Sequence, residues 1–439
     1  MTAEFQKSEA QQSEAKSSPS WLSFVERAEL FLAVAYAVSL PLSQTATWVL
    51  LALGVAAWVL SALSRKLLQL PPLSTGWAPL TIPLLIFVVA LTISGAFNSG
   101  SSPGQIGPHC LKESVETVLG FKSVFPYFWA FRISRISRVC SATAIVFLLW
   151  VSAAAGIWGG IQQVFNIHSG FKYLQGTGFL FHPMAYAGQM QIFSMLALGL
   201  LLSGGYKKLS DSCLNAQLNA ALSFSQNNEV FALITMANFV GLLFAGERSA
   251  WLGGFAAVIA IAIVKSWRFG LLSTLAMLGA GGLSWLFIPL VKTRLSALAS
   301  GNDISVSVRK RIWLDCLNNY FPQSPIFGVG LRKFPHFDIP EAIVPGVSID
   351  INHGHSNYVH ILTATGVLGF ASYILLICWT FVAAVKKVAQ SLNAEDKYSA
   401  GVAMGVFGAA VSLAIAGLFE FNFGTAQVRL AQWFIFGLL

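Results

Sequence analysis

The most informative residues for chemistry are three histidines in the segment from Asn352 to His360. His353, His355 and His360 lie where a long polar segment gives way to an apolar run. A neutral imidazole can take a proton from a hydroxyl group near pH 7, because its unperturbed pKa is about 6.5. The spacing His-x-His-x4-His could instead supply three zinc ligands, or the histidines could be purely structural. No His-Glu-x-x-His motif occurs and Asp350 is the only nearby carboxylate, so a catalytic base is favoured over a metal site.

Two arginine motifs could hold an anionic group. Glu247-Arg248-Ser249 lies between two apolar runs, so Arg248 either pairs with Glu247 or holds a phosphate through two parallel hydrogen bonds, which lysine would do less well. Arg309 and Trp313 are four residues apart and share one helix face, where they could present a cation beside a flat ring. Arg311 competes with Arg309 for this role. An arginine that only packs on a tryptophan gives the same spacing.

Polar residues at two further helix ends complete the candidate site. His182-Pro183 opens an apolar run, where proline suits the first helical turn. Another polar group lies near the end of the chain, and capping or turn formation is the simpler explanation for both. The candidate supporting residues are Trp313, His353, Asn357, Tyr358, His182, Glu420 and Asn422. No P-loop is found, and Gly328-Val329-Gly330 lacks the third glycine of a dinucleotide fingerprint, so we expect no nucleotide cofactor.

The composition indicates what must position these residues. Of 439 residues, 55% are hydrophobic and only 10% are charged, whereas a soluble domain carries about 25% charged residues. This excludes an ordinary soluble enzyme, a disordered chain and a nucleic-acid binder, because the apolar surface must face lipid. The net charge of +9 indicates that basic residues orient the protein in the membrane and contact anionic lipid. Five scattered cysteines give no disulfide or metal pattern.

The apolar runs predict an all-α membrane protein with about twelve transmembrane helices. A helix needs about 20 apolar residues to cross the bilayer, and alternating strands of a barrel are missing. Ten runs are clear and two, near 118–131 and 428–439, are weak. The clear runs lie near 24–41, 45–63, 78–97, 139–160, 184–203, 229–246, 249–265, 269–290, 357–384 and 399–419.

Basic residues predict the orientation, with the N-terminus inside, because fifteen of them, including Arg65, Arg132 and Arg138, lie in the inner segments and only five in the short outer segments. The polar residues 1–20 read as a disordered inner tail, residues 21–290 as helices one to nine and 357–439 as helices ten to twelve. Residues 291–356 form one long outer loop between helices nine and ten. This loop is basic although it lies outside, which suits an anionic ligand at the membrane surface, with an ordinary solvated loop as the alternative.

Five motifs, in this order, resemble the O-antigen ligase family of bacterial membrane proteins. They are His-Pro-x-x-x-Ala, Arg-Ser between two tight spans, Arg-x-x-x-Trp with Pro-x-x-Gly-x-Gly, His-Ser-Asn-x-Tyr with Gly-x-x-Gly, and Phe-Glu-x-Asn-Phe-Gly. The motifs span the chain from about residue 170 to the C-terminus. The sequence departs from the family pattern at Glu247, where a small residue is more usual, and at Gln427, where an acidic residue is common.

The resemblance implies a metal-independent, inverting glycosyltransferase of the bacterial inner membrane without a cofactor. Such proteins move a glycan from an undecaprenyl-diphosphate carrier to an acceptor on the periplasmic side, which for the ligases is a lipid A-core sugar. It implies that His355 deprotonates or orients the acceptor hydroxyl and that Arg248 and Arg309, or Arg311, hold the donor diphosphate. A polysaccharide polymerase or a protein O-oligosaccharyltransferase of the same family remains open. A small-anion transporter of the bicarbonate type is the alternative of another class.

Overall fold

The computed structural model describes residues 19–74, 76–167, 175–208, 224–300, 303–339 and 349–439. Nearly all regular structure in this part is helical, as the composition predicts. The exception is an antiparallel pair of short strands, β1 (Phe337–Ile339) and β2 (Ile349–Ile351), with Asp338 opposite Asp350. The predicted tail, residues 1–20, lies outside the described residues apart from its last two positions.

Seven helices in the described part are long and apolar enough to cross a membrane, judged by length and composition. Together they make this chain a multi-pass membrane protein. They are α3 (Gln44–Leu67), α7 (Arg138–Val164), α8 (Pro183–Ser203), α11 (Arg248–Lys265), α12 (Trp267–Phe287), α15 (Asn357–Asn393) and α16 (Lys397–Ala416).

The remaining helices are shorter or less apolar, so the predicted total of twelve spans stays a prediction. The weak run near 118–131 divides into α5, a 3-10 turn and α6, and the run near 428–439 gives the 11-residue helix α17. The shorter or less apolar helices of the described part are α2 (Ser20–Ser39), α4 (Thr81–Phe97), α5 (Cys110–Gly120), α6 (Phe125–Ile136), α10 (Asn228–Phe244), α13 (Pro289–Ala299), α14 (Ile304–Asp315) and α17 (Ala426–Phe436). Short 3-10 or π segments are η1 (Phe121–Val124), η2 (Gly205–Lys208), η3 (Cys316–Tyr320), η4 (Phe321–Gln323) and η5 (Asn422–Gly424).

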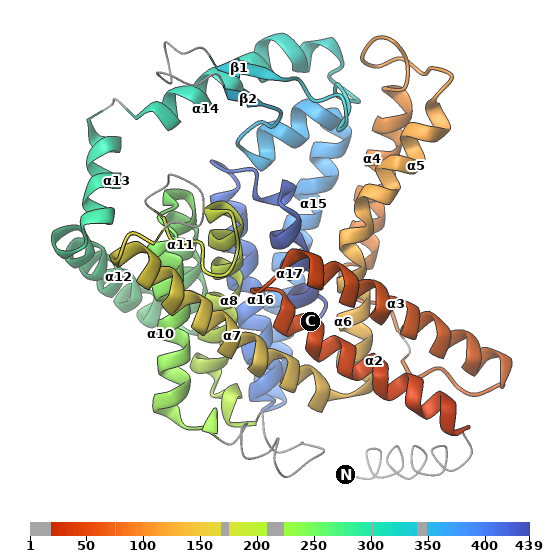
Figure 1. Cartoon of the computed structure of the whole chain (residues 1–439), viewed down its shortest axis with the longest axis vertical. Helices are drawn as coiled ribbons and strands as arrows, with labels where there is room; N and C mark the ends of the chain where they lie inside the picture. Colours follow the sequence, from red (N-terminus) through yellow and green to blue (C-terminus); the bar gives the residue numbers. More distant parts are fainter. Residues whose placement is uncertain (1–18, 75, 168–174, 209–223, 301–302, 340–348) are drawn as a thin grey trace.

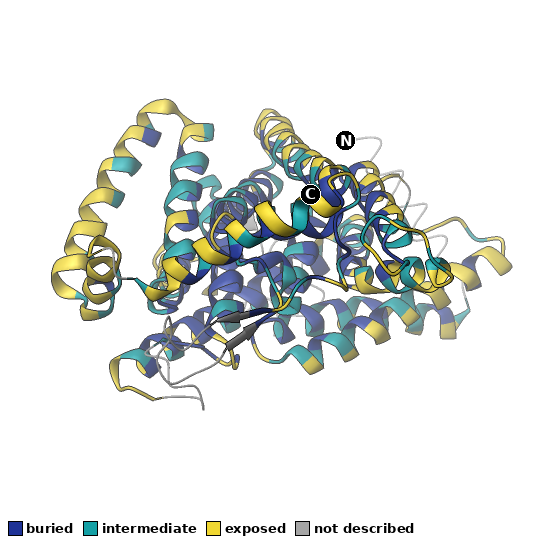
Figure 2. Ribbon diagram, turned by 90° about the horizontal axis from the view of Figure 1, so that it is seen from above, coloured by how far each residue is buried: buried dark blue, intermediate teal, exposed yellow. Residues whose placement is uncertain are grey.

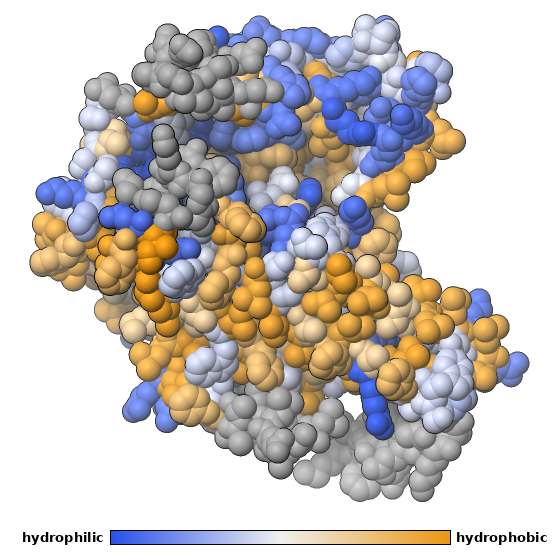
Figure 3. All heavy atoms as spheres, in the orientation of Figure 1, coloured by the Kyte–Doolittle hydropathy of each residue, from blue (hydrophilic) through white to orange (hydrophobic). Residues whose placement is uncertain are grey.

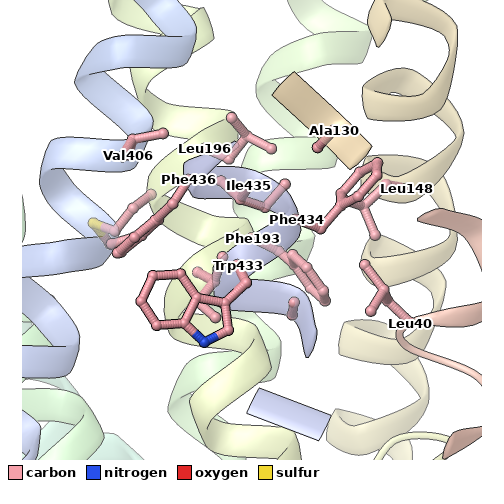
Figure 4. Packing of buried hydrophobic residues seen from close by; sticks show 14 of the residues in the cluster. Leu40, Ala130, Leu148, Phe193, Leu196, Val406, Trp433, Phe434, Ile435 and Phe436 are labelled. Atoms are coloured by element: carbon pink, nitrogen blue, oxygen red, sulfur yellow. The ribbon is translucent and has the colours of Figure 1, made fainter. Parts of the chain in front are cut away.

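The centre of the bundle is closely packed around α8, α16 and α17. A Cβ atom on Gly199 of α8 would lie 2.4 Å from the carbonyl oxygen of Gly401 on α16, so these two helices approach at backbone distance. Small residues allow such contacts between membrane helices. Figure 4 shows Phe434 of α17 among the surrounding apolar side chains, including Phe193 of α8. Although α17 is short, it is therefore part of the core.

The outside of the bundle is apolar where lipid would lie. In Figure 3 a hydrophobic surface covers the middle of the molecule, and hydrophilic residues gather at the end that carries α14 and the strands in Figure 1. Along α12 the one buried residue is Gly270. Figure 2 shows the same contrast between buried helices inside and exposed ribbon faces outside.

Ion pairs connect helices that are distant in sequence. Arg132 and Glu29 are both buried, and Ser61 also accepts a hydrogen bond from Arg132 at 3.3 Å. Asp396 caps α16 through the Ser399 N–H and also pairs with Arg138 at the start of α7. The pairs are Arg65–Glu26 at 2.7 Å, Arg132–Glu29 at 2.8 Å and Arg138–Asp396 at 2.5 Å. All three arginines belong to the basic set that the sequence analysis places inside.

Helix α15 is interrupted at Gly366, whose φ of 66° and ψ of −169° are not helical. The interruption leaves two carbonyl oxygens before it and two N–H groups after it without helical partners, and buried backbone groups need partners. The segment 325–330 supplies all four. The N–H groups of Val329, Gly330, Val367 and Leu368 donate to the carbonyl oxygens of Thr363, Ala364, Pro325 and Ile326 at 2.9, 2.8, 2.8 and 3.3 Å, respectively.

Helix α4 holds the same segment from its other side. Ser94 Oγ and Asn98 Nδ2 both donate to the carbonyl oxygen of Phe327, at 2.5 and 3.1 Å. The Pro-x-x-Gly-x-Gly motif is thus a backbone connection between the segment that follows α14, helix α4 and the broken helix α15.

We expect Gly366→Ala to destabilise the protein by about 1–3 kcal/mol from backbone strain alone, because this φ/ψ region is essentially restricted to glycine. The added Cβ would also lie 2.3 Å from the carbonyl group of Ile326. Thermal unfolding in detergent measures the effect. Gly281→Ala on α12 is the matched control, because nothing lies within 4 Å of its Cβ position. Equal unfolding temperatures for Gly366→Ala and the unsubstituted protein would contradict this account.

Candidate active site

Helix α14 presents Arg309 toward the protein and Arg311 toward solvent. Val308, Ile312 and Cys316 form a buried stripe that packs with residues of β1, β2 and α15. Arg309 lies next to Val308 of this stripe and its side chain is 14% exposed, whereas Arg311 is exposed to solvent. Between the two candidates from the sequence, the geometry therefore favours Arg309.

The histidine segment folds into a tight turn in which two histidines serve as acceptors. His353 Nδ1 accepts the N–H of His355, and His360 Nδ1 accepts the N–H of Gly354, both at 3.3 Å. Trp313 Nε1 of α14 donates to the carbonyl oxygen of Gly354 at 2.9 Å. His355 itself has a φ of 44°, in the left-handed region. The turn fixes the backbone of His355 and leaves its side chain for other contacts.

Asn357 and Asn422 join the start of α15 to the loop after α16. Asn357 Nδ2 donates to Asn422 Oδ1 at 2.7 Å, and Asn357 Oδ1 accepts the N–H of Phe423 at 3.0 Å. Tyr358 OH donates to the carbonyl oxygen of Ala414 at 3.0 Å. These predicted supporting residues are buried or half-buried structural links, and they place Glu420 beside the histidine turn.

Glu420 is the carboxylate at which the predicted cation and the predicted base meet. Its Oε2 accepts a hydrogen bond from Arg309 Nη2 at 3.3 Å, and its Oε1 lies 4.0 Å from His355 Nδ1. The Glu420 and His355 side chains are 10% and 15% exposed. Among the described residues, His355 Nδ1 and Arg309 Nε have no hydrogen-bond partner although both atoms are shielded from solvent. Buried polar atoms without a partner are uncommon in native proteins, and a bound ligand can satisfy them.

The surroundings of His355 disfavour the protonated form of its imidazole. Burial, the neighbouring His353 and the Arg309 guanidinium lower the pKa of His355 to about 3. Burial is also the main cause that raises the pKa of Glu420 to about 7, with Glu247 acting in the same direction and Arg309 opposing it. At neutral pH His355 is therefore a neutral imidazole that lies close to a carboxyl group poised between its two charge states.

Arg248 pairs with Asp303 and not with Glu247. Both guanidinium Nη atoms of Arg248 bond to the Asp303 carboxylate, and this pairing is the main cause that lowers the pKa of Asp303. Asp303 also caps α14 by accepting the Val306 N–H at 3.1 Å. Glu247 instead accepts a hydrogen bond from Gln175 at 3.1 Å. Asp303 was not predicted from the sequence as a site residue, although an aspartate just before a helix is a recognisable capping signal.

His182 caps α8 and belongs to the same electrostatic cluster. Its Nδ1 accepts the N–H of Met184 at 3.2 Å. Burial lowers the pKa of His182, and Glu247 raises it in part; His182 in turn contributes to lowering the pKa of His353. The tops of α8 and α11 therefore lie within electrostatic reach of the histidine turn.

The three histidines of the turn do not converge on a common point. Their Nδ1 atoms have separate surroundings, and in the described ranges no group of three or more His, Cys, Asp or Glu side chains is placed to hold a metal ion. The arrangement suits proton transfer by one imidazole and binding of an anion by one guanidinium.

Part of the chain is similar to a known protein family. No curated protein matches the chain. The model of one family, described as O-antigen ligase, matches residues 231–374, a range that contains Arg248, Arg309 and His355 but not Glu420. The resemblance inferred from the motifs is thus confirmed: residues 231–374, about a third of the chain, are similar to the O-antigen ligase family.

Proposed function

We propose that the protein transfers a glycan from an undecaprenyl-diphosphate carrier to an acceptor hydroxyl on the periplasmic face of the bacterial inner membrane. The acceptor that we propose is a lipid A-core sugar, as in O-antigen ligation. The observation that carries the proposal is the meeting of Arg309 and His355 at Glu420, on the hydrophilic end of an apolar bundle.

The reaction that these residues support is a direct displacement. The acceptor oxygen attacks the anomeric carbon of the donor sugar from the face opposite the diphosphate, so that the configuration inverts. The new carbon–oxygen bond forms as the bond to the diphosphate breaks, and the diphosphate leaves with the electron pair. His355 takes the hydroxyl proton, and Arg309 stabilises the charge that develops on the diphosphate.

Arg248 has a different place in this proposal from Arg309. Its guanidinium is held by Asp303 and by the carbonyl oxygen of Arg294, so a diphosphate would have to displace Asp303 to reach it. Arg309 has one bond to Glu420, one to the exposed Ser305 and a shielded Nε–H without a partner. We therefore assign the main donor contact to Arg309.

We also propose the topology that this reaction needs. The N-terminus is cytoplasmic, residues 21–290 contain helices one to nine, 291–356 form the periplasmic loop, and 357–439 contain helices ten to twelve. Arg65, Arg132 and Arg138 belong to the segments that we place inside, and each pairs with a carboxylate that is distant in sequence. Arg309 belongs to the segment that we place outside.

Transfer by the purified protein in EDTA tests this function. The donor is a short glycan on undecaprenyl diphosphate, and the acceptors are lipid A-core, a second lipid-linked glycan and a pilin-type peptide. Transfer to lipid A-core is the expected result and identifies a ligase, whereas extension of the second glycan would identify a polymerase. Complete loss of transfer in EDTA, restored by a divalent metal, would contradict the metal-independent mechanism.

A further inference from the structure

The two carboxylate oxygens of Glu420 have unequal partners. Oε2 is bonded to Arg309 at 3.3 Å, whereas Oε1 accepts only the neighbouring Phe421 N–H at 3.2 Å and stops 4.0 Å from His355 Nδ1. That separation exceeds a hydrogen bond. In the described part of the chain, His355 Nδ1 is thus a shielded nitrogen facing a carboxylate that is bonded elsewhere.

In this arrangement His355 is a weak base. A group whose pKa is about 3 binds a proton too weakly to assist a hydroxyl efficiently near pH 7, because the best general base has a pKa near the working pH. Besides burial, the causes are His353 and the Arg309 cation. Of these, the charge of Arg309 is the one that a bound anion would neutralise.

We propose that Glu420 is a positioning residue that couples donor binding to base function: a diphosphate that binds Arg309 releases the Glu420 carboxylate, which then accepts a hydrogen bond from Nδ1–H of His355. This inference rests on the proposed function of the site and names its regulation. His355 Nε2 then takes the acceptor proton, and the resulting imidazolium is balanced by the Glu420 carboxylate.

Donor binding then changes the proton affinity of His355 through two effects of the same sign. The positive charge of Arg309 is compensated by the diphosphate, and a negative carboxylate comes within hydrogen-bond reach of the imidazole. An opposite charge at such a distance shifts a pKa by about 1–3 units. By linkage, the protein with a protonated His355 must bind the donor more tightly than the protein with a neutral His355, by the same factor by which donor binding raises the proton affinity of His355.

Among the described residues, the other titratable groups that affect this pair, directly or through His353, include Glu247 before α11, His182 before α8 and His353 in the turn. Glu247 raises the pKa of Glu420, while His353 lowers the pKa of His355 and is itself affected by His182. None of these three is bonded to Arg309 in the described residues, so a diphosphate on Arg309 leaves them in place. The coupling therefore depends on Glu420.

The test measures the pKa of His355 directly. The full chain is purified in detergent with 13C-labelled histidine, and NMR titrations are recorded with and without farnesyl diphosphate as the probe. The signal that is missing from His355→Asn identifies the residue. We expect the probe to raise the pKa of His355 by at least about one unit in the unsubstituted protein. In Glu420→Gln we expect less than half of this rise.

Glu113→Gln is the matched control, because Glu113 is a carboxylate at the start of α5 and lies outside the cluster. It should respond to the probe like the unsubstituted protein. If Glu420→Gln does not fold, Arg309→Gln tests the coupling instead. In this variant the pKa of His355 should already be raised before any probe is added, and the probe should not raise it further. A merely structural Glu420 would change the unfolding temperature but not this response.

Two results would overturn the coupling. One is a full rise of the His355 pKa in Glu420→Gln; the other is no rise in the unsubstituted protein when 31P NMR shows that the probe is bound. The experiment needs no glycan transfer, so it separates this inference from the proposed function. A normal pKa response without any transfer would overturn the reaction and support the coupling, whereas transfer without a response would overturn the coupling alone.

Discussion

Replacing His355 by asparagine is expected to lower the rate of glycan transfer about 10²–10⁴-fold, the usual contribution of a general base. Asparagine cannot take the acceptor proton, but it tolerates the left-handed backbone that His355 adopts with a φ of 44°. Alanine would remove the base and add backbone strain at the same position. Single-turnover transfer from a lipid-diphosphate glycan measures the effect.

His109→Asn is the control for this substitution. His109 is exposed just before α5 and makes no side-chain capping bond, so its replacement should leave transfer unchanged. Thermal unfolding of both variants checks that they remain folded. Full transfer by a folded His355→Asn protein would rule out His355 as the base.

Arg309→Gln is expected to lower transfer about 10²–10³-fold, the range observed when one fixed donor to a developing negative charge is removed. Glutamine keeps a hydrogen-bond donor but removes the cation that holds Glu420 and, in our proposal, the diphosphate. The transfer rate of Arg309→Lys should lie between those of the unsubstituted protein and Arg309→Gln, because lysine retains the charge and loses the two parallel hydrogen bonds. Binding of undecaprenyl diphosphate, measured beside transfer, should follow the same order.

Arg311→Gln gives a control on the same helix. It removes the same charge two residues away, where the side chain is exposed to solvent. Its donor affinity and transfer rate should stay close to those of the unsubstituted protein. If Arg311→Gln and Arg309→Gln were equally impaired, the net charge of α14 would matter, and the specific placement of Arg309 would not.

The helical bundle could be predicted from the sequence because long apolar runs carry their own signal. The runs near 139–160 and 184–203 correspond to α7 and α8 within a few residues. Where the prediction was weak, tertiary packing decides the outcome. The region near 118–131 forms two helices separated by a short 3-10 turn, and the short helix α17 is held by apolar contacts with α2, α6 and α8.

The candidate site was predicted in part. The motifs grouped Arg309, Trp313 and the histidine turn into one candidate site. The four-residue spacing of Arg309 and Trp313 predicted that they share one helix face. The partners of the arginines could not be read from the sequence. Asp303 lies far from Arg248 in the chain, and Glu420 lies far from Arg309, so each pairing depends on how the helices assemble. Glu420 was predicted as a supporting residue, without a partner.

The broken helix α15 sets the boundary for exchanging parts of this protein with a relative. Because segment 325–330 and the backbone around Gly366 complete each other's hydrogen bonds, a chimaera that swaps only the loop 291–356 would cut across this connection. A transplant that extends to Leu368 would carry both halves, together with Arg309 and His355. The modular unit for engineering acceptor or donor preference is therefore the stretch from residue 291 to Leu368, which includes the first turns of α15.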